Sequence, residues 1–258
     1  MKILSAVAAI IFFAVRAMAE TTNGLSDAEI QGRQLAKQLC EMRPDTNFSQ
    51  SGILSVRDGT GDILNIPIKF EVFAYSTEWY QVSQTNWLSL YQAFPTNGLN
   101  EELQVTHNGN LQNKYFHHAG SGIGRIPEVE DQHVVFPGKP DEPFIHSDFS
   151  IGDLGLEFFC WPQQKVLKKE VRRSRGCTVL ESTNPNPTNG YSRVVSWIDD
   201  ETLGIVHAEA YDANGKLLKE FDPKSFKKVN GQWQLQEMEI RNVQTGSRSR
   251  MEFDVKNQ

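Results

Sequence analysis

The sequence predicts an α+β domain in which one large antiparallel sheet is covered by only a few helices. Asn-Gly pairs stand at 108–109, 214–215 and 230–231, between short runs of residues with β-strand character. This arrangement is typical of β-hairpins. Only two segments, residues 26–42 and about 147–160, have apolar residues at roughly helical spacing. Strands therefore dominate the predicted fold.

The first 19 residues have the pattern of a cleavable signal peptide. Lys2 precedes an apolar run from residue 3 to residue 15, and Ala17-Met18-Ala19 supplies the small residues that signal peptidase requires. We expect cleavage after Ala19 and a periplasmic location. The alternative, a transmembrane anchor, is disfavoured because a bilayer-spanning helix needs about 20 apolar residues. No later segment of the sequence is apolar for long enough to span a membrane.

The composition then limits the class of partner. The 258 residues carry a formal net charge of −6, and removing Lys2 and Arg16 with the signal peptide changes this to −8. A protein with this negative balance and no basic face is a poor nucleic-acid binder, so we expect no nucleic-acid partner. We expect residues 20–258 to form a single domain.

The first half of this domain begins with a helix and continues as strands. Ser26 and Glu29 have the spacing of a capping box, and Pro44 ends the helix predicted over residues 26–42. Residues 51–57 and 66–72 form a predicted hairpin around a turn at 59–62, because apolar and polar residues alternate in the second run. A further hairpin would continue from it through residues 79–85.

Residues 86–145 read as an elaboration of the domain. They contain an apolar cluster at 87–94, a predicted hairpin formed by 101–107 and 111–117, and a long surface loop at 120–143 that is rich in glycine and proline. Loops of that length are uncommon unless they are mobile or functional.

The second half combines one helix with an antiparallel meander. A short helix is predicted over residues 147–160, and closely spaced strands separated by turn residues follow it. The expected strands are 166–173, 177–182, 191–198, 205–212, 216–221, 226–229, 232–243 and 248–255.

Few residues suggest chemistry. The six histidines include no helical pair that would bind a metal, and His117 and His118 point to opposite faces of a strand. Gly120-Ser121-Gly122 does not match a nucleophile elbow, because Ala119 stands where glycine is required. We therefore predict no catalytic residue, no metal and no cofactor.

The three cysteines leave two interpretations open. An exported chain with Cys40, Cys160 and Cys177 has at least one unpaired thiol. Cys160 and Cys177 flank one predicted strand and could be neighbours. The alternative is that all three are small buried hydrophobic residues.

The second half also resembles the exported outer-membrane lipoprotein-sorting proteins, which are related to the periplasmic lipoprotein carrier LolA. The order and spacing of short motifs carry the resemblance, although Arg241 and Gln234 replace an acidic residue and a proline that such proteins often have. The motifs lie at residues 146–154, 195–199, 210–219, 230–233, 238, 245–246 and 253–255.

The resemblance implies a half-open β-barrel, a strongly curved antiparallel sheet with helices covering an apolar cavity. It also implies a non-enzymatic binding or transport protein whose partner is a lipid, a lipoprotein acyl chain or another hydrophobic ligand. The residues expected to line the cavity are Phe70, Val72, Trp79, Phe149, Leu154, Phe158, Trp197 and Met238.

Two other functions remain open at this point. The domain could be an interaction or sensor module for envelope proteins, with the loop at 119–145 as its contact surface and no lipid cargo. It could also be a secreted hydrolase that uses His117 and His118, and substitution of both histidines would test for activity.

Overall fold

The computed structural model describes residues 24–254 apart from 78–79, 81, 83–85, 110, 121–137, 188–189 and 230–231. The expected signal peptide at 1–19 and most of the expected loop at 120–143 therefore lie outside the described residues. No helix within the described part is long and apolar enough to cross a membrane.

In the described part of the chain, twelve strands form one unclosed sheet in which all neighbouring strands are antiparallel. The strand order is β5-β4-β3-β2-β1-β12-β11-β10-β9-β8-β7-β6, so the first and last strands pair in the middle of the sheet. The strands are β1 (Phe48–Arg57), β2 (Ile63–Phe73), β3 (Trp87–Ala93), β4 (Asn100–His107), β5 (Lys114–Gly120), β6 (Gln163–Arg172), β7 (Arg175–Thr183), β8 (Arg193–Asp199), β9 (Ile205–Tyr211), β10 (Leu217–Val229), β11 (Gln232–Asn242) and β12 (Arg248–Phe253).

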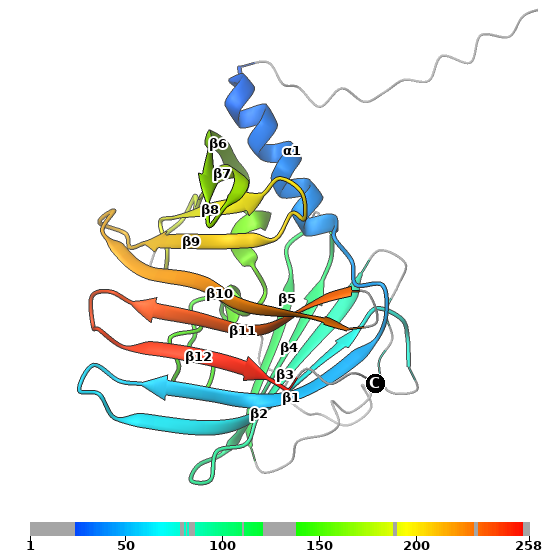
Figure 1. Cartoon of the computed structure of the whole chain (residues 1–258), viewed down its shortest axis with the longest axis vertical. Coiled ribbons are helices and arrows are strands. Elements are labelled where there is room, and N and C mark those ends of the chain that lie inside the picture. Colours follow the sequence, from blue (N-terminus) through cyan, green and yellow to red (C-terminus); the bar gives the residue numbers. More distant parts are fainter. Residues whose placement is uncertain are drawn as a thin grey trace, which may run out of the picture.

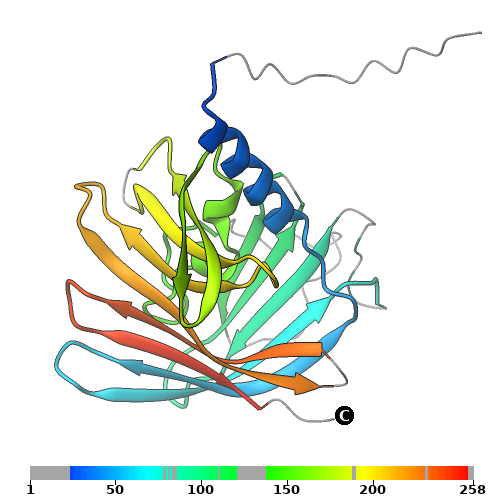
Figure 2. The same ribbon diagram turned by 45° about the horizontal axis from the view of Figure 1, so that its top comes forward.

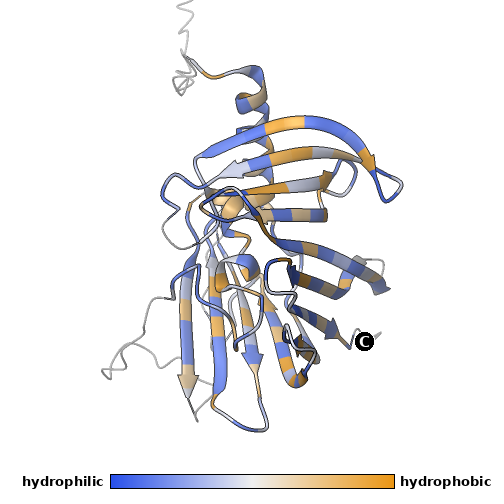
Figure 3. Ribbon diagram, turned by 90° about the vertical axis from the view of Figure 1, so that its left-hand side faces the viewer, coloured by the Kyte–Doolittle hydropathy of each residue, from blue (hydrophilic) through white to orange (hydrophobic). Residues whose placement is uncertain are grey.

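The sheet curves strongly, so that β3 to β5 face β8 to β11 across the interior of the molecule (Figures 1 and 2). Alternating hydrophobic and hydrophilic bands run along many strands (Figure 3). The predicted antiparallel meander is confirmed. The two strands predicted at 216–221 and 226–229 are instead one strand, β10, with an irregular register between Pro223 and Ser225. Proline cannot donate to the ladder, which explains an irregularity at this position.

The residues predicted as an apolar cluster at 87–94 form a strand, β3. Residues 88–93 are all buried, so both faces of this strand are covered and the sequence does not alternate. The hairpin predicted around residues 108–109 is present as β4 and β5. Together β3, β4 and β5 extend the sheet beyond β2.

The first helix, α1 (Asp27–Glu41), is confirmed with its capping box. Ser26 Oγ accepts a hydrogen bond from the backbone N–H of Glu29, and the Glu29 carboxylate accepts one from the backbone N–H of Ser26. The helix contacts the edge strand β6 through Gly32, where an added Cβ would lie 2.5 Å from the backbone nitrogen of Lys165. The glycine thus allows the helix to approach the strand closely.

The helix predicted over 147–160 is shorter and divided. The structure has a four-residue α-helix, α2 (Ile151–Leu154), followed by a 3-10 helix, η1 (Glu157–Cys160). Ser150 caps α2, and Leu156 adopts a left-handed conformation with φ of 52°. A left-handed residue cannot continue a right-handed helix, so the helical segment breaks at this point.

The segment 138–161 connects the two halves of the sheet. It covers the inner face of the sheet, which is the face that bounds the interior of the molecule. Phe144, Phe149 and Leu154 pack with side chains of β1 to β5, β11 and β12 in one buried cluster. Phe158 and Phe159 pack with α1 and with side chains of β7 to β9 in a second cluster. A third cluster, centred on Trp197, lies on the opposite face of β7 to β9. The core of the molecule therefore has two inner parts, joined by this segment.

Candidate functional site

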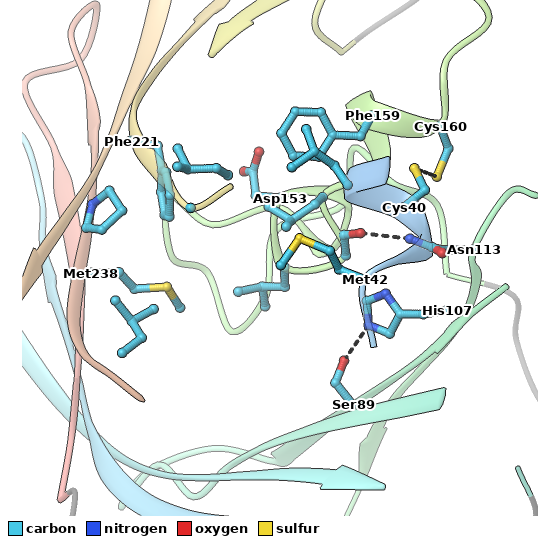
Figure 4. A pocket seen from close by; sticks show the side chains of 18 of the residues that line it. Cys40, Met42, Ser89, His107, Asn113, Asp153, Phe159, Cys160, Phe221 and Met238 are labelled. Atoms are coloured by element: carbon cyan, nitrogen blue, oxygen red, sulfur yellow. Dashed lines mark hydrogen bonds between the residues drawn. The ribbon is translucent and has the colours of Figure 1, made fainter. Parts of the chain in front are cut away.

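A cavity of about 360 Å³ lies between the two inner clusters. Its walls come from the end of α1, from β2 to β4, from α2 and η1, and from β9 to β11 (Figure 4). Most of the lining side chains are apolar. They include Leu39, Met42, Phe70, Tyr91, Phe149, Leu154, Phe159, Phe221, Leu235 and Met238.

A second pocket of about 570 Å³ adjoins the cavity. The two share Phe70, Tyr91, Leu235 and Met238 as lining residues. The second pocket is more polar than the cavity, because residues 43–46 and the glutamines of β1 and β11 line it. An elongated molecule with an apolar end and a polar end would match this succession of surfaces.

A stacked aromatic pair, Trp87 and His107, forms part of the wall of the inner cavity. The imidazole of His107 lies parallel to the indole of Trp87, with ring centroids 3.6 Å apart and an interplanar angle of 6°. His107 Nε2 is 3.0 Å from Ser89 Oγ. Desolvation within this enclosed wall lowers the pKa of His107 to about 3, so its ring is neutral at physiological pH.

Two further polar side chains of the cavity, Asn113 and Asp153, have partners in the protein. Asn113 donates its side-chain N–H to the carbonyl oxygen of Gly155 at 2.7 Å. The carboxylate of Asp153 accepts hydrogen bonds from the Tyr191 hydroxyl and the backbone N–H of Ser150, and it lies 3.6 Å from Lys219 Nζ. The charge is therefore compensated within the protein, and the walls favour an uncharged, apolar occupant.

The Ser89–His107 pair has part of the geometry of a nucleophile and its base. A histidine whose pKa lies near 3 is a weak general base at neutral pH. Among the described residues, no carboxylate hydrogen-bonds to the other ring nitrogen of His107, which a catalytic triad would require. In the same part of the chain, no group of three or more His, Cys, Asp or Glu side chains could hold a metal ion.

The structure brings four of the expected cavity residues together. Phe70, Phe149, Leu154 and Met238 line the inner cavity. Their role in binding remains a prediction.

The other expected residues lie elsewhere. Phe158 belongs to the second inner cluster, and Val72 is buried on β2 outside the cavity walls. Trp197 lies on the opposite face of the sheet, where Arg172 stacks on its indole at 4.3 Å. Trp79 lies outside the described residues.

Sequence reasoning missed several lining residues, of which Tyr91 is the most informative. Tyr91 stands opposite Phe70 in the pairing of β2 with β3, and their rings stack with centroids 4.6 Å apart. Recognising residues 87–93 as a strand would have identified it. Leu39 and Met42 were visible only as part of the apolar face of α1.

The structure also shows which cysteine lies beside Cys160. Its Sγ lies 3.3 Å from that of Cys40, whereas Cys177 is buried in the cluster on the opposite face of the sheet. Cys160 and Cys177 are therefore not neighbours, which excludes the first of the two interpretations left open by the sequence. Cys177 is a small buried hydrophobic residue, as the alternative interpretation expected.

Comparison with known proteins supports the same fold. A family model described as "uncharacterized protein" matches residues 126–256, just over half of the chain. None of the curated proteins matches the sequence.

Three solved structures cover nearly the whole domain. A DUF1329 family protein from Desulfovibrio piger has a TM-score of 0.66 and 19% identity, over 89% of this chain and 92% of that chain. A putative outer membrane lipoprotein-sorting protein domain from Vibrio parahaemolyticus has a TM-score of 0.66 and 17% identity, over 88% and 92%. A LolA superfamily protein from Nitrosomonas europaea has a TM-score of 0.57 and 15% identity, over 87% and 91%.

These identities establish a shared fold, and the expected resemblance to lipoprotein-sorting proteins is confirmed at that level. The chain belongs to the protein family whose model covers residues 126–256, and its fold is that of the outer-membrane lipoprotein-sorting and LolA superfamily structures.

Proposed function

We propose that this chain is a non-enzymatic periplasmic binding protein that holds the acyl chain of a lipid or lipoprotein in its inner cavity. The observation that carries the proposal is the apolar cavity of about 360 Å³ between two otherwise packed clusters. Water finds few hydrogen-bond partners in an apolar cavity, so such a cavity favours a hydrophobic occupant. The curved sheet then acts as a half-open barrel, with α1 and the segment 138–161 as its cover.

The adjoining pocket gives the ligand an orientation. An acyl chain in the inner cavity gains about 0.8 kcal/mol for each CH₂ group that leaves water. Its polar end would lie in the second pocket, where Gln50 donates a hydrogen bond to Gln234 and Arg43 bonds to the carbonyl oxygen of Ala74. A headgroup there would meet polar side chains, while the acyl chain contacts the apolar walls of the inner cavity.

The signal-peptide pattern and the fold support the same function. The signal-peptide pattern of residues 1–19 favours export, and two of the similar structures are described as a lipoprotein-sorting domain and a LolA superfamily protein. Carrying a hydrophobic cargo requires no catalytic group, so the weak base at His107 does not count against the proposal.

The proposal is tested by native mass spectrometry of protein purified from the periplasm without detergent, followed by titration with a fluorescent fatty acid. We expect a copurifying species of lipid mass, or saturable uptake of the probe by the delipidated protein. Protein that carries no lipid and takes up no probe would contradict the proposal and favour an interaction module for envelope proteins.

A matched pair of variants locates the binding site. Leu235→Trp fills the space that both pockets share, and we expect it to weaken probe binding at least tenfold. Leu167→Trp adds the same ring at a position on β6 that is 43% exposed and outside the cavity walls, so binding should not change. Equal loss in both variants, or in neither, would place the probe outside the cavity.

A further inference from the structure

Two cysteine side chains meet in the wall of the cavity. Cys40 belongs to the last turn of α1, and Cys160 is the final residue of η1. Their Sγ atoms are 3.3 Å apart although 120 positions separate them in the sequence (Figure 4). A disulfide bond requires about 2.0 Å, so an approach of about 1.3 Å would join them.

We propose that Cys40 and Cys160 form a disulfide bond in the exported protein, which fixes the C-terminal end of α1 to η1. The signal-peptide pattern directs the chain to an oxidising compartment, where such bonds form and persist. Both residues are only partly buried, so an oxidant reaches them from the cavity side. Cys177 remains a thiol, because it is buried on the opposite face of the sheet.

The chemistry is a thiol–disulfide exchange with a disulfide-containing oxidant. The thiolate of one of the two cysteines attacks one sulfur of the oxidant and releases the other sulfur as a thiolate. The second cysteine, as thiolate, then attacks the Sγ atom of the first and releases the remaining half of the oxidant as a thiolate. The two cysteines lose two electrons and two protons, and the oxidant becomes two thiols.

The bond would fix one wall of the cavity. Leu39, Cys40 and Met42 line the inner cavity, and residues 43–46, which follow directly, line the second pocket. Within the described residues, α1 contacts mainly the single edge strand β6, with fewer contacts to η1. A covalent link to η1 therefore restrains the stretch of chain that borders both pockets.

The direct test is alkylation and peptide mapping of protein expressed with its signal peptide and purified from the periplasm. After unfolding without reductant, we expect one alkylated thiol, at Cys177, and a linked pair of peptides containing Cys40 and Cys160. After reduction, all three cysteines should react. Three reactive thiols before reduction, even after incubation with oxidised glutathione, or a link to Cys177, would overturn the proposal.

Thermal unfolding gives an independent measurement. A link across 120 positions constrains the unfolded chain strongly, so reduction should lower the Tm by about 10 °C. Cys177→Ser should keep the full response to reductant, whereas Cys40→Ser with Cys160→Ser should unfold at the reduced Tm and not respond. An equal response in both variants would contradict the assignment. Neither measurement uses a ligand, so failure of the proposed function would leave this result unaffected.

Discussion

Asp148 and Ser249 form two hydrogen bonds with each other, and each residue donates one of them. Ser249 Oγ donates to a carboxylate oxygen of Asp148 at 2.9 Å and accepts a hydrogen bond from the backbone N–H of Asp148 at 2.8 Å. Ser247 Oγ donates to the other carboxylate oxygen at 2.6 Å. Ser249 is fully buried on β12, so this contact joins the segment 138–161 to the middle of the sheet.

We expect Asp148→Ala to lower the free energy of unfolding by about 2–3 kcal/mol. It removes two hydrogen bonds to a charged acceptor and leaves the buried Ser249 hydroxyl without its carboxylate partner. Chemical denaturation measures the change. Asp141→Ala is the matched control, because Asp141 is exposed in the same segment and should change stability by less than about 0.5 kcal/mol. Equal effects would show that the Asp148 contact contributes nothing specific.

The close approach of α1 to β6 leads to a second prediction. Gly32→Ala would place a methyl group 2.5 Å from the backbone of Lys165, so helix and strand must separate. We expect a loss of about 1–2 kcal/mol, since the overpacking penalty exceeds the roughly 1 kcal/mol gained from helix propensity. Differential scanning calorimetry should show a Tm lower by about 3–6 °C.

The control for this variant is Gly176→Ala on β7, where the added Cβ would meet only the Asp200 carboxylate at 3.7 Å. It should leave the Tm nearly unchanged. A Gly32→Ala protein as stable as the wild type would mean that α1 can shift away from β6 at no cost.

The third prediction concerns the ion pair between His117 and Glu101, which also contacts the segment 138–161. His117 Nε2 is 3.0 Å from a Glu101 carboxylate oxygen, which also accepts the backbone N–H of Ile145 at 2.8 Å. The hydrogen bond to Glu101 raises the pKa of His117 above its usual 6.5. Burial raises the pKa of Glu101, but the hydrogen bonds from His117 and Ile145 outweigh it and leave the pKa below 4.5.

The signs of these shifts define a pH window. Because the folded state raises the pKa of His117, its contribution is complete below pH 6.5 and is lost as the pH rises through the folded pKa. The Glu101 contribution is present above pH 4.5 and is lost as the pH falls through its lowered pKa. The pair therefore stabilises the fold most between about pH 4.5 and 6.5.

His117→Gln should remove this dependence. We expect the Tm difference between wild type and variant to be larger at pH 5.5 than at pH 8.5, as measured by circular dichroism melts across that range. His118→Gln is the control, because His118 is the next residue on the same strand and points away from Glu101. A difference that stays constant with pH would show that His117 is not charged in the folded protein.

Local signals made much of the fold predictable. The capping box at Ser26 and Glu29 determines where α1 begins, and the alternating residues of β12 determine which side faces the core. These features depend on neighbours in the sequence. The break of the second helix at Leu156 depends instead on a left-handed backbone conformation. A leucine at that position does not indicate such a conformation.

The candidate site was less predictable because its walls come from distant parts of the chain. Phe149 and Met238 were expected to line the cavity, and both do. Tyr91 and His107 lie on strands whose burial on both faces, as in β3, removes the alternating pattern. The pairing of β1 with β12, which places these strands opposite β9 to β11, is a long-range relationship that periodicity does not encode.

The last prediction concerns His107, whose effect on stability has the opposite sign to that of His117. Its pKa is lowered to about 3 by desolvation, so the unfolded chain binds a proton near pH 6.5 that the folded protein does not. Stability should therefore fall as the pH decreases below 6.5, by on the order of 1–2 kcal/mol between pH 7 and pH 5. His107→Phe keeps an aromatic ring beside Trp87 and removes the titration, so its stability should decrease less over this range.

Proton NMR of the histidine ring provides a direct measurement in the same proteins. The resonance of His107 should not titrate between pH 5 and 8, and Ser89→Ala should leave that behaviour unchanged, because burial and not the hydroxyl lowers the pKa. A His107 resonance that titrates near pH 6.5 would show that water fills the cavity beside the ring. Such a result would also weaken the case for an apolar ligand, since the same wall bounds the proposed binding site.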